Sequence, residues 1–345
     1  NVQNKETGKF YSAKIFNFEL TKLRRDELIN LSREVNIISK INHPSFLKFI
    51  GYSPTDFAQR QHPVIITETF SKETLASILS LERDLVRIPN WDETTKLINI
   101  YGIAAGMSYL HSHNILHRDL TPESIFFNKN LHPKIGNFGL CILNHTLESM
   151  TNQSMSGIKG NPCYSAPEVL QMNEYSKAGD VYSFAFLVYE IVTNEVPFKN
   201  IKSNLSSLFN EIVIKAGRPE IKNNVPCCYC SLIESCWAQD PKDRPTFDQI
   251  EYLLKTEKDF LSGNVDKEKF LSYVKSIEES NVDFYSGKKI VQLDDLIRSK
   301  SRIDESGELN ESRENDDEDE NIGKERVEDE LEKESAMLNK IIENE

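Results

Sequence analysis

The sequence predicts an α+β fold in which a small strand-rich lobe comes before a larger helical lobe. Two observations support this prediction. Apolar and polar residues alternate near the N-terminus, and after residue 75 the apolar residues recur mostly at helical spacing. The chain has 345 residues, of which 39% are hydrophobic and 28% are charged, enough for one large bilobed domain or two ordinary ones.

Three segments near the N-terminus have the pattern of β-strands. Residues 9–16, "KFYSAKIF", place Tyr11, Ala13 and Ile15 on one face and polar side chains on the other. Residues 46–52, "FLKFIGY", and residues 64–70, "VIITETF", are further apolar runs of strand length. We therefore expect a small sheet in the N-terminal lobe.

Helical periodicity accounts for most of the remaining chain. Residues 21–41 carry apolar side chains at i, i+3, i+7 and i+10, as an amphipathic helix requires. A second stripe consists of Ile100, Ile103, Met107 and Leu110. Residues 180–192 form an almost wholly apolar helix, residues 246–262 close the helical lobe, and residues 266–300 have moderate helical character.

The last part of the chain differs sharply in composition. Residues 301–345 contain eighteen acidic and six basic residues, so they carry −12 of the formal net charge of −13. This segment has almost nothing to bury, so we expect it to be disordered, with a short helix near its end. An acidic tail of this kind generally keeps a protein soluble, although docking on a basic partner or on its own lobe remains open.

Charge and hydropathy exclude two classes of function. The rest of the chain is nearly neutral, so it offers no basic field for nucleic acid. The longest apolar run, residues 181–192, is shorter than the roughly 20 residues that cross a bilayer, and no secretory signal opens the chain. We expect a cytoplasmic protein without a membrane span. Because the first methionine is Met107, we also expect the chain to be part of a longer protein.

Four of the six cysteines are clustered, as Cys227, Cys228, Cys230 and Cys236. Cys227 and Cys230 form a C-x-x-C pair, which is one half of a zinc site. Since no second pair or nearby histidine pair completes such a site, packing in a reducing compartment is the favoured interpretation.

Six short motifs occur in a fixed order along the first 262 residues. They are "YSAK" with Lys14, "ILHRDLTPESIFF" at 115–127, "NFG" at 137–139, "APE" at 166–168, "DVYSF" at 180–184 and "CWAQDPKDRP" at 236–245. This order resembles the protein kinase domain, and its ending is most similar to that of the tyrosine-kinase-like (TKL) group with a serine/threonine-type loop. The resemblance implies a bilobed kinase-like fold whose N-lobe is incomplete at its start.

The resemblance also implies a division of the chain. Residues 1–70 would be the partial N-lobe and hinge, and residues 71–262 the C-lobe. Residues 263–300 would be a helical extension, followed by the acidic tail of residues 301–345 with its short helix. The glycine-rich phosphate loop of the family would lie upstream of Val2.

The resemblance assigns roles to the residues at matching positions. Lys14 would neutralise the α- and β-phosphates of ATP, with Glu34 as its carboxylate partner. Asp119 would accept the proton of the substrate hydroxyl, and Arg118 and His117 would brace its loop. Asp180 would anchor the backbone of that loop, and Glu168 and Arg244 would form a structural ion pair under the "APE" segment. Further nucleotide contacts would come from Ser12 against adenine, Thr67 as gatekeeper, Glu68 to Phe70 as hinge, and Phe126 below the base.

Several family positions carry a changed residue. The aspartate that binds the bridging magnesium is Asn137, and the second metal ligand is Ser124. Magnesium prefers charged oxygen ligands, so an amide and a hydroxyl should hold it weakly or not at all. The lysine two residues after the catalytic aspartate is Thr121, and the threonine before the "APE" segment is Asn161. ATP binding is less affected, and we leave it open.

These changes favour a catalytically impaired, pseudokinase-like signalling module that acts through protein partners. The loss of metal ligands and of a positive charge should lower the rate by many orders of magnitude. The retained Lys14, Glu34 and Asp119 favour the alternative, an active serine/threonine kinase that phosphorylates proteins. A third interpretation makes the C-terminal region an interaction tether. Residues 140–165 contain several hydroxyls that an upstream kinase could phosphorylate or that are merely solvated.

Overall fold

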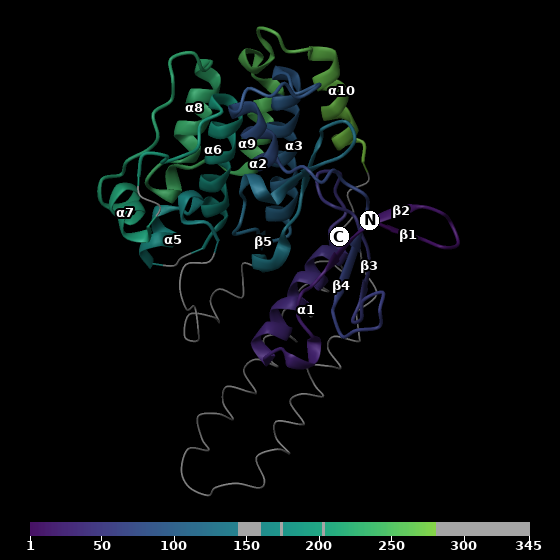
Figure 1. Cartoon of the computed structure of the whole chain (residues 1–345). Coiled ribbons are helices and arrows are strands. Elements are labelled where there is room, and N and C mark those ends of the chain that lie inside the picture. The colour runs from purple at the N-terminus through teal and green to yellow at the C-terminus, as the bar shows by residue number, and fades with distance from the viewer. Residues whose placement is uncertain (144–159, 173–174, 202–203, 281–345) are drawn as a thin grey trace, which may run out of the picture. The chain divides into compact units, whose positions relative to one another are not determined.

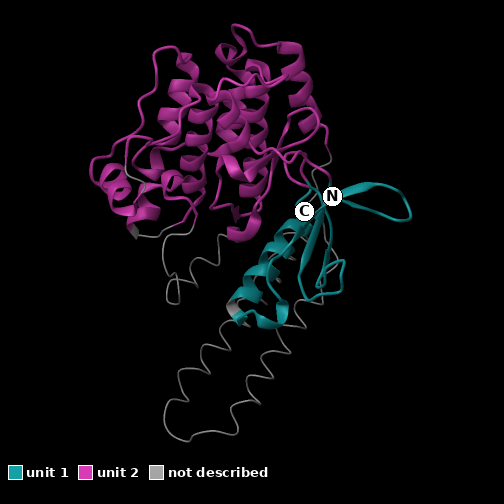
Figure 2. Ribbon diagram, viewed as in Figure 1, with its two compact units in different colours: residues 1–42, 48–68, 283–345 teal, residues 43–47, 69–282 magenta. Residues whose placement is uncertain are grey.

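The computed structural model describes residues 1–143, 160–172, 175–201 and 204–280 (Figure 1). These residues divide into two compact units (Figure 2). The described part of unit 1 comprises residues 1–42 and 48–68, and that of unit 2 comprises residues 43–47 and those after 68. Among these described residues, no helix has the length and apolar character needed to cross a bilayer.

Unit 1 is a four-stranded antiparallel sheet with one long helix. The strands lie in the order β1-β2-β4-β3, with bounds Val2–Gln3, Phe10–Ile15, Val64–Thr67 and Phe49–Ser53 in that order. The strand register pairs Lys14 of β2 with Ile65 of β4. A short 3-10 turn, η1 (Leu20–Lys22), precedes α1 (Arg25–Lys40), which packs against β3. The predicted strand at 9–16 and helix at 21–41 are therefore present.

The core of unit 1 follows from the apolar stripe of α1. Leu28, Leu31, Val35 and Ile38, the stripe identified in the sequence, are all buried. Val64 and Ile65 of β4 are also buried, so the sheet and the helix share one apolar layer. This packing holds the strand that carries Lys14 and the helix that carries Glu34.

The predicted strand at 46–52 is shorter than expected at its start. β3 begins at Phe49, and residues 43–47 belong to unit 2. There, Phe46 forms a bridge with Ile135, and the Leu47 N–H donates to the Ile135 carbonyl at 3.2 Å. The Ile135 N–H in turn donates to the Ser45 carbonyl at 2.6 Å. The backbone hydrogen bonds of residues 45–47 are thus satisfied outside the sheet.

Unit 2 is mostly helical, with two small antiparallel strand pairs. Its helices are α2 (Leu75–Arg83), α3 (Glu93–Ser112), α5 (Pro167–Met172), α6 (Lys177–Thr193), α7 (Leu205–Phe209), α8 (Cys227–Cys236), α9 (Phe247–Thr256) and α10 (Lys267–Glu278). β5 (Ile115–Leu116) pairs with β8 (Ile142–Leu143), and β6 (Ile125–Phe127) pairs with β7 (Pro133–Ile135). Short turns include η2 (Pro122–Ser124), η3 (Phe138–Leu140), η5 (Pro162–Tyr164), η6 (Asn210–Ile214), η7 (Pro241–Asp243) and η8 (Lys258–Leu261).

Two helices form the centre of unit 2. α3 packs against α6, α9 and α10, and α6 also packs against α8, as Figure 1 lets the reader follow. Nearly all of α6 between Asp180 and Ile191 is buried, as the apolar run of the sequence predicts. The side chain of Ser176 caps the start of α6 by accepting from the Gly179 N–H. Because α6 is buried along most of its length, residues that bond to its first turn are held in fixed positions.

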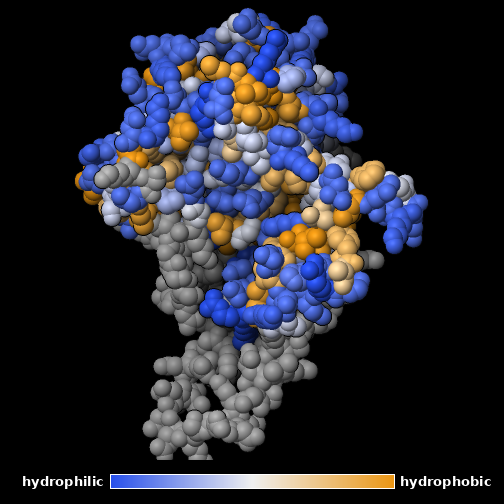
Figure 3. Space-filling view, viewed as in Figure 1, coloured by the Kyte–Doolittle hydropathy of each residue, from blue (hydrophilic) through white to orange (hydrophobic). Residues whose placement is uncertain are grey.

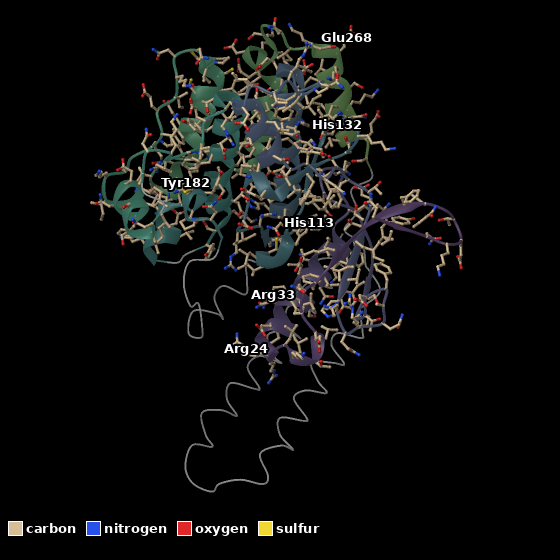
Figure 4. The ribbon with its side chains drawn as sticks, in the orientation of Figure 1. Arg24, Arg33, His113, His132, Tyr182 and Glu268 are labelled. Carbon is tan, nitrogen blue, oxygen red and sulfur yellow. The ribbon has the colours of Figure 1, made fainter. Side chains whose placement is uncertain are left out.

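The helix predicted at 246–262 is divided in two, and a further helix follows. α9 ends at Thr256, and η8 continues the chain. α10 packs on α3 through buried side chains that include Phe270 and Tyr273. A Cβ at Gly102 of α3 would lie 2.3 Å from the Tyr273 hydroxyl, so only glycine allows this approach. The Tyr273 ring also lies 4.5 Å from that of His132, which precedes β7 and is labelled in Figure 4.

The visible surface is largely hydrophilic (Figure 3). The large apolar residues that are exposed are dispersed along the chain and include Phe10, Phe57, Leu85, Ile214 and Tyr252. Single exposed apolar residues are normal for a globular protein and do not by themselves indicate a docking surface.

Candidate functional site

One buried carboxylate forms hydrogen bonds with the backbone at the start of segment 117–124 in unit 2. Asp180, in the first turn of α6, accepts the His117 N–H at 2.9 Å and the Arg118 N–H at 2.8 Å. It also bonds the His111 Nε2 at 2.9 Å. The sequence predicted that Asp180 anchors this loop, and these three contacts are what such an anchor requires.

The surroundings of Asp180 favour its charged form. Burial by itself would raise the pKa of this carboxyl, but the hydrogen bond and charge of His111 and the contacts to His117 together lower it. Asp180 is only 2% exposed. It is therefore a buried anion whose charge is stabilised by hydrogen-bond donors on several sides.

His117 links two parts of the segment. Its Nε2 lies 3.1 Å from the Gly136 carbonyl, and its Nδ1 accepts the Asp119 N–H at 3.3 Å. Complete burial lowers the pKa of His117, which favours the neutral ring. A neutral imidazole donates through one nitrogen and accepts through the other, which suits these two contacts.

Asp119 forms a direct hydrogen bond with Asn137. The Asn137 Nδ2 donates to the Asp119 Oδ2 at 2.8 Å. Asn137 adopts a left-handed conformation, with φ of 66° and ψ of 53°, which asparagine tolerates better than most residues. The sequence predicted that both residues belong to one site, and the structure brings their side chains into contact within unit 2.

The pKa of Asp119 is raised to about 6. Burial is the largest cause, and the negative charge of Glu123 adds to it, whereas the hydrogen bond from Asn137 acts in the opposite direction. A carboxyl with this pKa is a stronger base than an ordinary aspartate at neutral pH. A shift of this kind is common at functional sites.

The side chain of Ser124 is occupied by contacts within its own turn. Its hydroxyl donates to the Thr121 carbonyl at 2.8 Å and accepts the Thr121 N–H at 3.1 Å. Ser124 is fully buried, and Thr121 is 4% exposed. A hydroxyl has one donor and two acceptor positions, so only one acceptor position of Ser124 is left over.

Gly160 lies close to the loop on another side. It has a φ of +89°, and a Cβ placed there would lie 3.1 Å from the Arg118 carbonyl and 3.3 Å from the Asp119 Oδ1. Both the conformation and the space therefore favour glycine at this position. The neighbouring Asn161 side chain accepts the Cys163 N–H at 3.1 Å and begins the η5 turn.

In unit 1, Lys14 and Glu34 form an ion pair. The Lys14 Nζ lies 2.7 Å from the Glu34 Oε1 and 4.6 Å from the centre of the Phe16 ring. Half of the Lys14 side chain is exposed, and Glu34 is 8% exposed. The pairing that the sequence predicted for these two residues, twenty positions apart, is present.

The other predicted nucleotide contacts divide between the two units. In unit 1, Thr67 is buried at the end of β4, and the Glu68 N–H donates to the Lys48 carbonyl at 2.9 Å. Ser12 lies on β2, where the register pairs it with Thr67. In unit 2, the rings of Phe70 and Phe126 are in edge-to-face contact at 4.8 Å.

A second ion pair lies deep in unit 2. The guanidinium of Arg244 binds both carboxylate oxygens of Glu168, at 2.7 and 2.9 Å. The same guanidinium donates to the carbonyls of Ala178 and Ala238 and lies 5.0 Å from the ring of Tyr182, which is labelled in Figure 4. This is the structural pair that the sequence predicted under the "APE" segment.

The cysteine cluster does not form a metal centre in the described part of the chain. Cys227 and Cys230 lie on the first turn of α8, and the Cys230 thiol contacts the Val225 carbonyl at 3.6 Å. No group of three or more His, Cys, Asp or Glu side chains suited to a metal ion occurs among the described residues.

Two contacts of the site were not predicted from the sequence. One is the hydrogen bond between Asn137 and Asp119, and the other is the position of Tyr175 against Arg118, at 4.0 Å from guanidinium carbon to ring centre. Tyr175 precedes Ser176, the residue that caps the helix that carries Asp180. In the sequence, the only indication of this contact was an aromatic residue shortly before the helix. Aromatic residues occur at such positions too often to predict a particular contact.

Together, these features define a class of protein. A strand lysine paired with a helix glutamate, a loop aspartate with a raised pKa, and a buried aspartate beneath that loop are the parts of a phosphoryl-transfer fold. The family model described as protein tyrosine and serine/threonine kinase matches residues 14–254. The chain belongs to the protein kinase family.

Individual relatives agree with this assignment. A probable serine/threonine-protein kinase of Dictyostelium discoideum is 32% identical over 243 residues, covering 70% of this chain and 14% of the relative. The dual specificity protein kinase shkC of the same organism is 31% identical over 63% of this chain and 41% of the relative. The serine/threonine-protein kinase CTR1 of Arabidopsis thaliana is 32% identical over 65% of this chain and 26% of the relative. The matched region thus spans less than half the length of each of these relatives.

Proposed function

We propose that this chain is a kinase-family signalling module of the TKL type whose phosphoryl transfer is impaired, and that it acts in the cytoplasm through protein partners. The observation that carries the proposal is the hydrogen bond from Asn137 to Asp119. In the family, the position of Asn137 holds an aspartate that binds magnesium. In this chain it holds an amide that donates to the neighbouring carboxylate at 2.8 Å.

The residues at the two metal positions do not fit a tightly bound magnesium ion. The amide of Asn137 uses its nitrogen on Asp119, so only a neutral carbonyl oxygen is left to coordinate a cation. The Ser124 hydroxyl is fully buried and bonded to the Thr121 backbone. Weak or absent magnesium binding, and with it slow or absent transfer, follows from this donor set.

The proposal includes ATP binding that does not require a tightly bound magnesium ion. The ion pair between Lys14 and Glu34 keeps the ammonium ready for phosphate oxygens, and half of the lysine side chain is exposed. Within unit 1, Thr67 supplies a buried contact for a base at the end of β4. ATP would therefore bind with an affinity that depends little on magnesium.

A second candidate function is an active serine/threonine kinase, and one observation favours it. The pKa of Asp119 is about 6, close to the value that suits a general base at neutral pH. An upstream kinase acting on residues 140–165 would give this candidate a means of control. Those hydroxyls at residues 144–159 lie outside the described residues.

The test compares ATP binding with and without magnesium by thermal shift, together with transfer of the γ-phosphate to a protein substrate. A ligand at 100 times its dissociation constant stabilises the folded state by about 2.7 kcal/mol. We expect a similar shift with ATP alone and with ATP and magnesium, and no transfer above that of Asp119→Ala. Magnesium-dependent stabilisation with transfer that Asp119→Ala abolishes would establish the active kinase instead.

A restoring pair of variants tests the metal positions directly. Asn137→Asp together with Ser124→Asn returns both family ligands, so it should make ATP binding dependent on magnesium. Asn130→Asp is a matched control, because Asn130 lies in the exposed turn between β6 and β7. Failure of the double variant to gain magnesium dependence, while still folded, would contradict this account of the site.

A further inference from the structure

Lys14 has a second partner in unit 1 besides the carboxylate of Glu34. Its Nζ lies 2.7 Å from the Glu34 Oε1 and 4.6 Å from the centre of the Phe16 ring. Phe16 follows Lys14 by two positions, so in extended backbone both side chains leave the chain on the same side. Phe16 directly follows β2, whereas Glu34 lies on α1. The ammonium therefore contacts two separate elements of unit 1.

The ring of Phe16 is itself fixed in position. The Phe16 N–H donates to the Pro63 carbonyl at 3.0 Å, and the His62 Nδ1 lies 3.0 Å from the Phe16 carbonyl. A carbonyl can only accept, so the His62 Nδ1 is the donor in this contact. The Phe16 ring also packs against the ring of Phe18, with their centres 5.1 Å apart. Both the backbone and the side chain of Phe16 are therefore anchored.

These two contacts leave donors of the ammonium available. An ammonium has three N–H donors, and among the described residues the Lys14 Nζ donates a hydrogen bond only to the Glu34 carboxylate. Half of the Lys14 side chain is exposed. An aromatic face attracts a cation through the ring quadrupole, which adds to the ion pair. An anion would thus meet a lysine that is already ordered, so less side-chain entropy is lost on binding.

We propose that Phe16 is a positioning residue for Lys14, whose ring keeps the ammonium beside Glu34 in the chain without nucleotide. The ammonium is then in place for the oxygens of a phosphate group. Because the two metal positions are poorly suited to magnesium, the lysine supplies a larger share of the charge that a polyphosphate requires. The part of this inference that concerns ATP rests on the proposed function, whereas the resting position of Lys14 does not.

The first test is NMR of the Lys14 side chain in the whole chain without nucleotide. Protons over an aromatic face are shifted upfield by the ring current, so the ε-methylene protons of Lys14 should lie upfield of those of exposed lysines. Phe16→Leu removes the ring and should abolish this shift. Phe16→Tyr keeps the ring and should retain it. An unshifted ε-methylene group in the wild type would overturn the proposal.

Glu34→Gln separates the contribution of the ring from that of the ion pair. It removes the charged partner of Lys14 and keeps Phe16 with its anchoring contacts, so part of the upfield shift should persist. Complete loss of the shift, as in Phe16→Leu, would mean that the carboxylate alone positions the lysine, and the proposal would fail.

ATP binding without magnesium provides the functional readout. Phe16→Leu should raise the Kd about two- to five-fold, the effect of one cation–π contact at an exposed site. Phe16→Tyr should restore the wild-type value. Tyr11→Leu is the matched control, because Tyr11 lies on the same strand and its ring also faces a lysine, Lys9, at 5.6 Å. This control should leave the Kd unchanged.

Two outcomes of the binding experiment separate this inference from the proposed function. An unchanged Kd in Phe16→Leu, in a wild type that binds ATP, would overturn the positioning role of Phe16. A wild type that does not bind ATP would refute the proposed nucleotide binding. In that case the NMR shifts of the chain without nucleotide would still decide whether Phe16 positions Lys14.

Discussion

Two aspartates of the same region have opposite electrostatic surroundings. Asp180 is 2% exposed and accepts backbone N–H groups from His117 and Arg118, and its pKa is lowered despite its burial. Asp119 is less buried, but among the described residues its carboxylate accepts a side-chain hydrogen bond from Asn137 alone, and its pKa is raised to about 6. Burial alone therefore does not set the charge of a carboxyl, because the number of donors decides the direction.

The two aspartates therefore have different roles, since one supports the structure of the loop and the other lies at the candidate reaction site. The charged form of Asp180 stabilises the folded protein. The charged form of Asp119 is less stable in the folded protein than in water. Functional sites commonly accept such a cost, which the surrounding structure must offset. In this chain the hydrogen bond from Asn137 offsets part of this cost, because that donor favours the charged form of Asp119.

The largest expected effect is on the supporting aspartate. Asp180→Asn replaces one acceptor oxygen by an NH2 group that faces the donors of the loop. The free energy of unfolding should fall by about 3–5 kcal/mol, measured by urea denaturation at pH 7.5. Asp243→Asn, at an exposed position of η7, is the control and should change it by less than about 0.5 kcal/mol. An effect as small as that of the control would mean that Asp180 is not the anchor of the loop.

The opposite sign is expected for Asp119→Asn. The folded-state pKa of about 6 lies above the ordinary value of 3.8, so the folded protein binds more protons than the unfolded chain between these values. Asp119 therefore lowers stability as pH rises from about 4 to about 6, and the loss persists above that range. Asp119→Asn should stabilise the protein by about 2 kcal/mol at pH 7.5 and by nothing near pH 3.5. A stabilisation independent of pH would contradict the raised pKa.

A smaller effect is expected for Asn137→Asp. The change removes the donor to Asp119 and places a second carboxylate beside it, so the pKa of Asp119 should rise further. Without divalent cations, unfolding at pH 7.5 should become easier by about 1–2 kcal/mol. Added magnesium should recover part of this loss by binding between the two carboxylates. A variant that is already more stable than wild type without magnesium would argue against the hydrogen bond.

The smallest effect concerns the turn that carries the second metal position. Ser124→Ala removes both contacts with the Thr121 backbone and should lower the free energy of unfolding by about 1 kcal/mol. It should leave the binding of ATP with magnesium unchanged, because this hydroxyl is occupied by the turn. Ser112→Ala, which removes a hydroxyl at an exposed position, serves as the control and should cost less. A loss of magnesium-dependent binding in Ser124→Ala would assign the hydroxyl to the metal.

Much of the fold could be predicted from periodicity. The stripe of Leu28 and Val35 predicted α1, and the apolar run from Val181 predicted α6, because burial on one face or on all faces leaves its own pattern in a sequence. The start of β3 could not be predicted, because Phe46 bonds to Ile135, nearly ninety residues away. The alternation of apolar and polar residues within one segment does not indicate a partner so distant in the sequence.

The candidate site shows the same division. Motif order alone placed Lys14 with Glu34 and Asp180 beneath Arg118, and the ion pair and the hydrogen bond are present. The sequence also showed that Asn137 and Ser124 replace better metal ligands. It did not show that the amide of Asn137 donates a hydrogen bond to Asp119, or that the Ser124 hydroxyl is hydrogen-bonded to the Thr121 carbonyl in its own turn.

The sequence by itself determined the family, the order of the elements and the chemical identity of each site residue, since these depend on residue type and spacing. The tertiary structure decided the protonation behaviour of Asp119 and the partners of Arg118 and Asn137. Such properties depend on which donors, charges and rings lie within a few ångströms, and residues far apart in the chain supply them. The stacking of Arg118 on Tyr175, 57 positions later, is set by the start of α6 and could be seen only once that helix was in place.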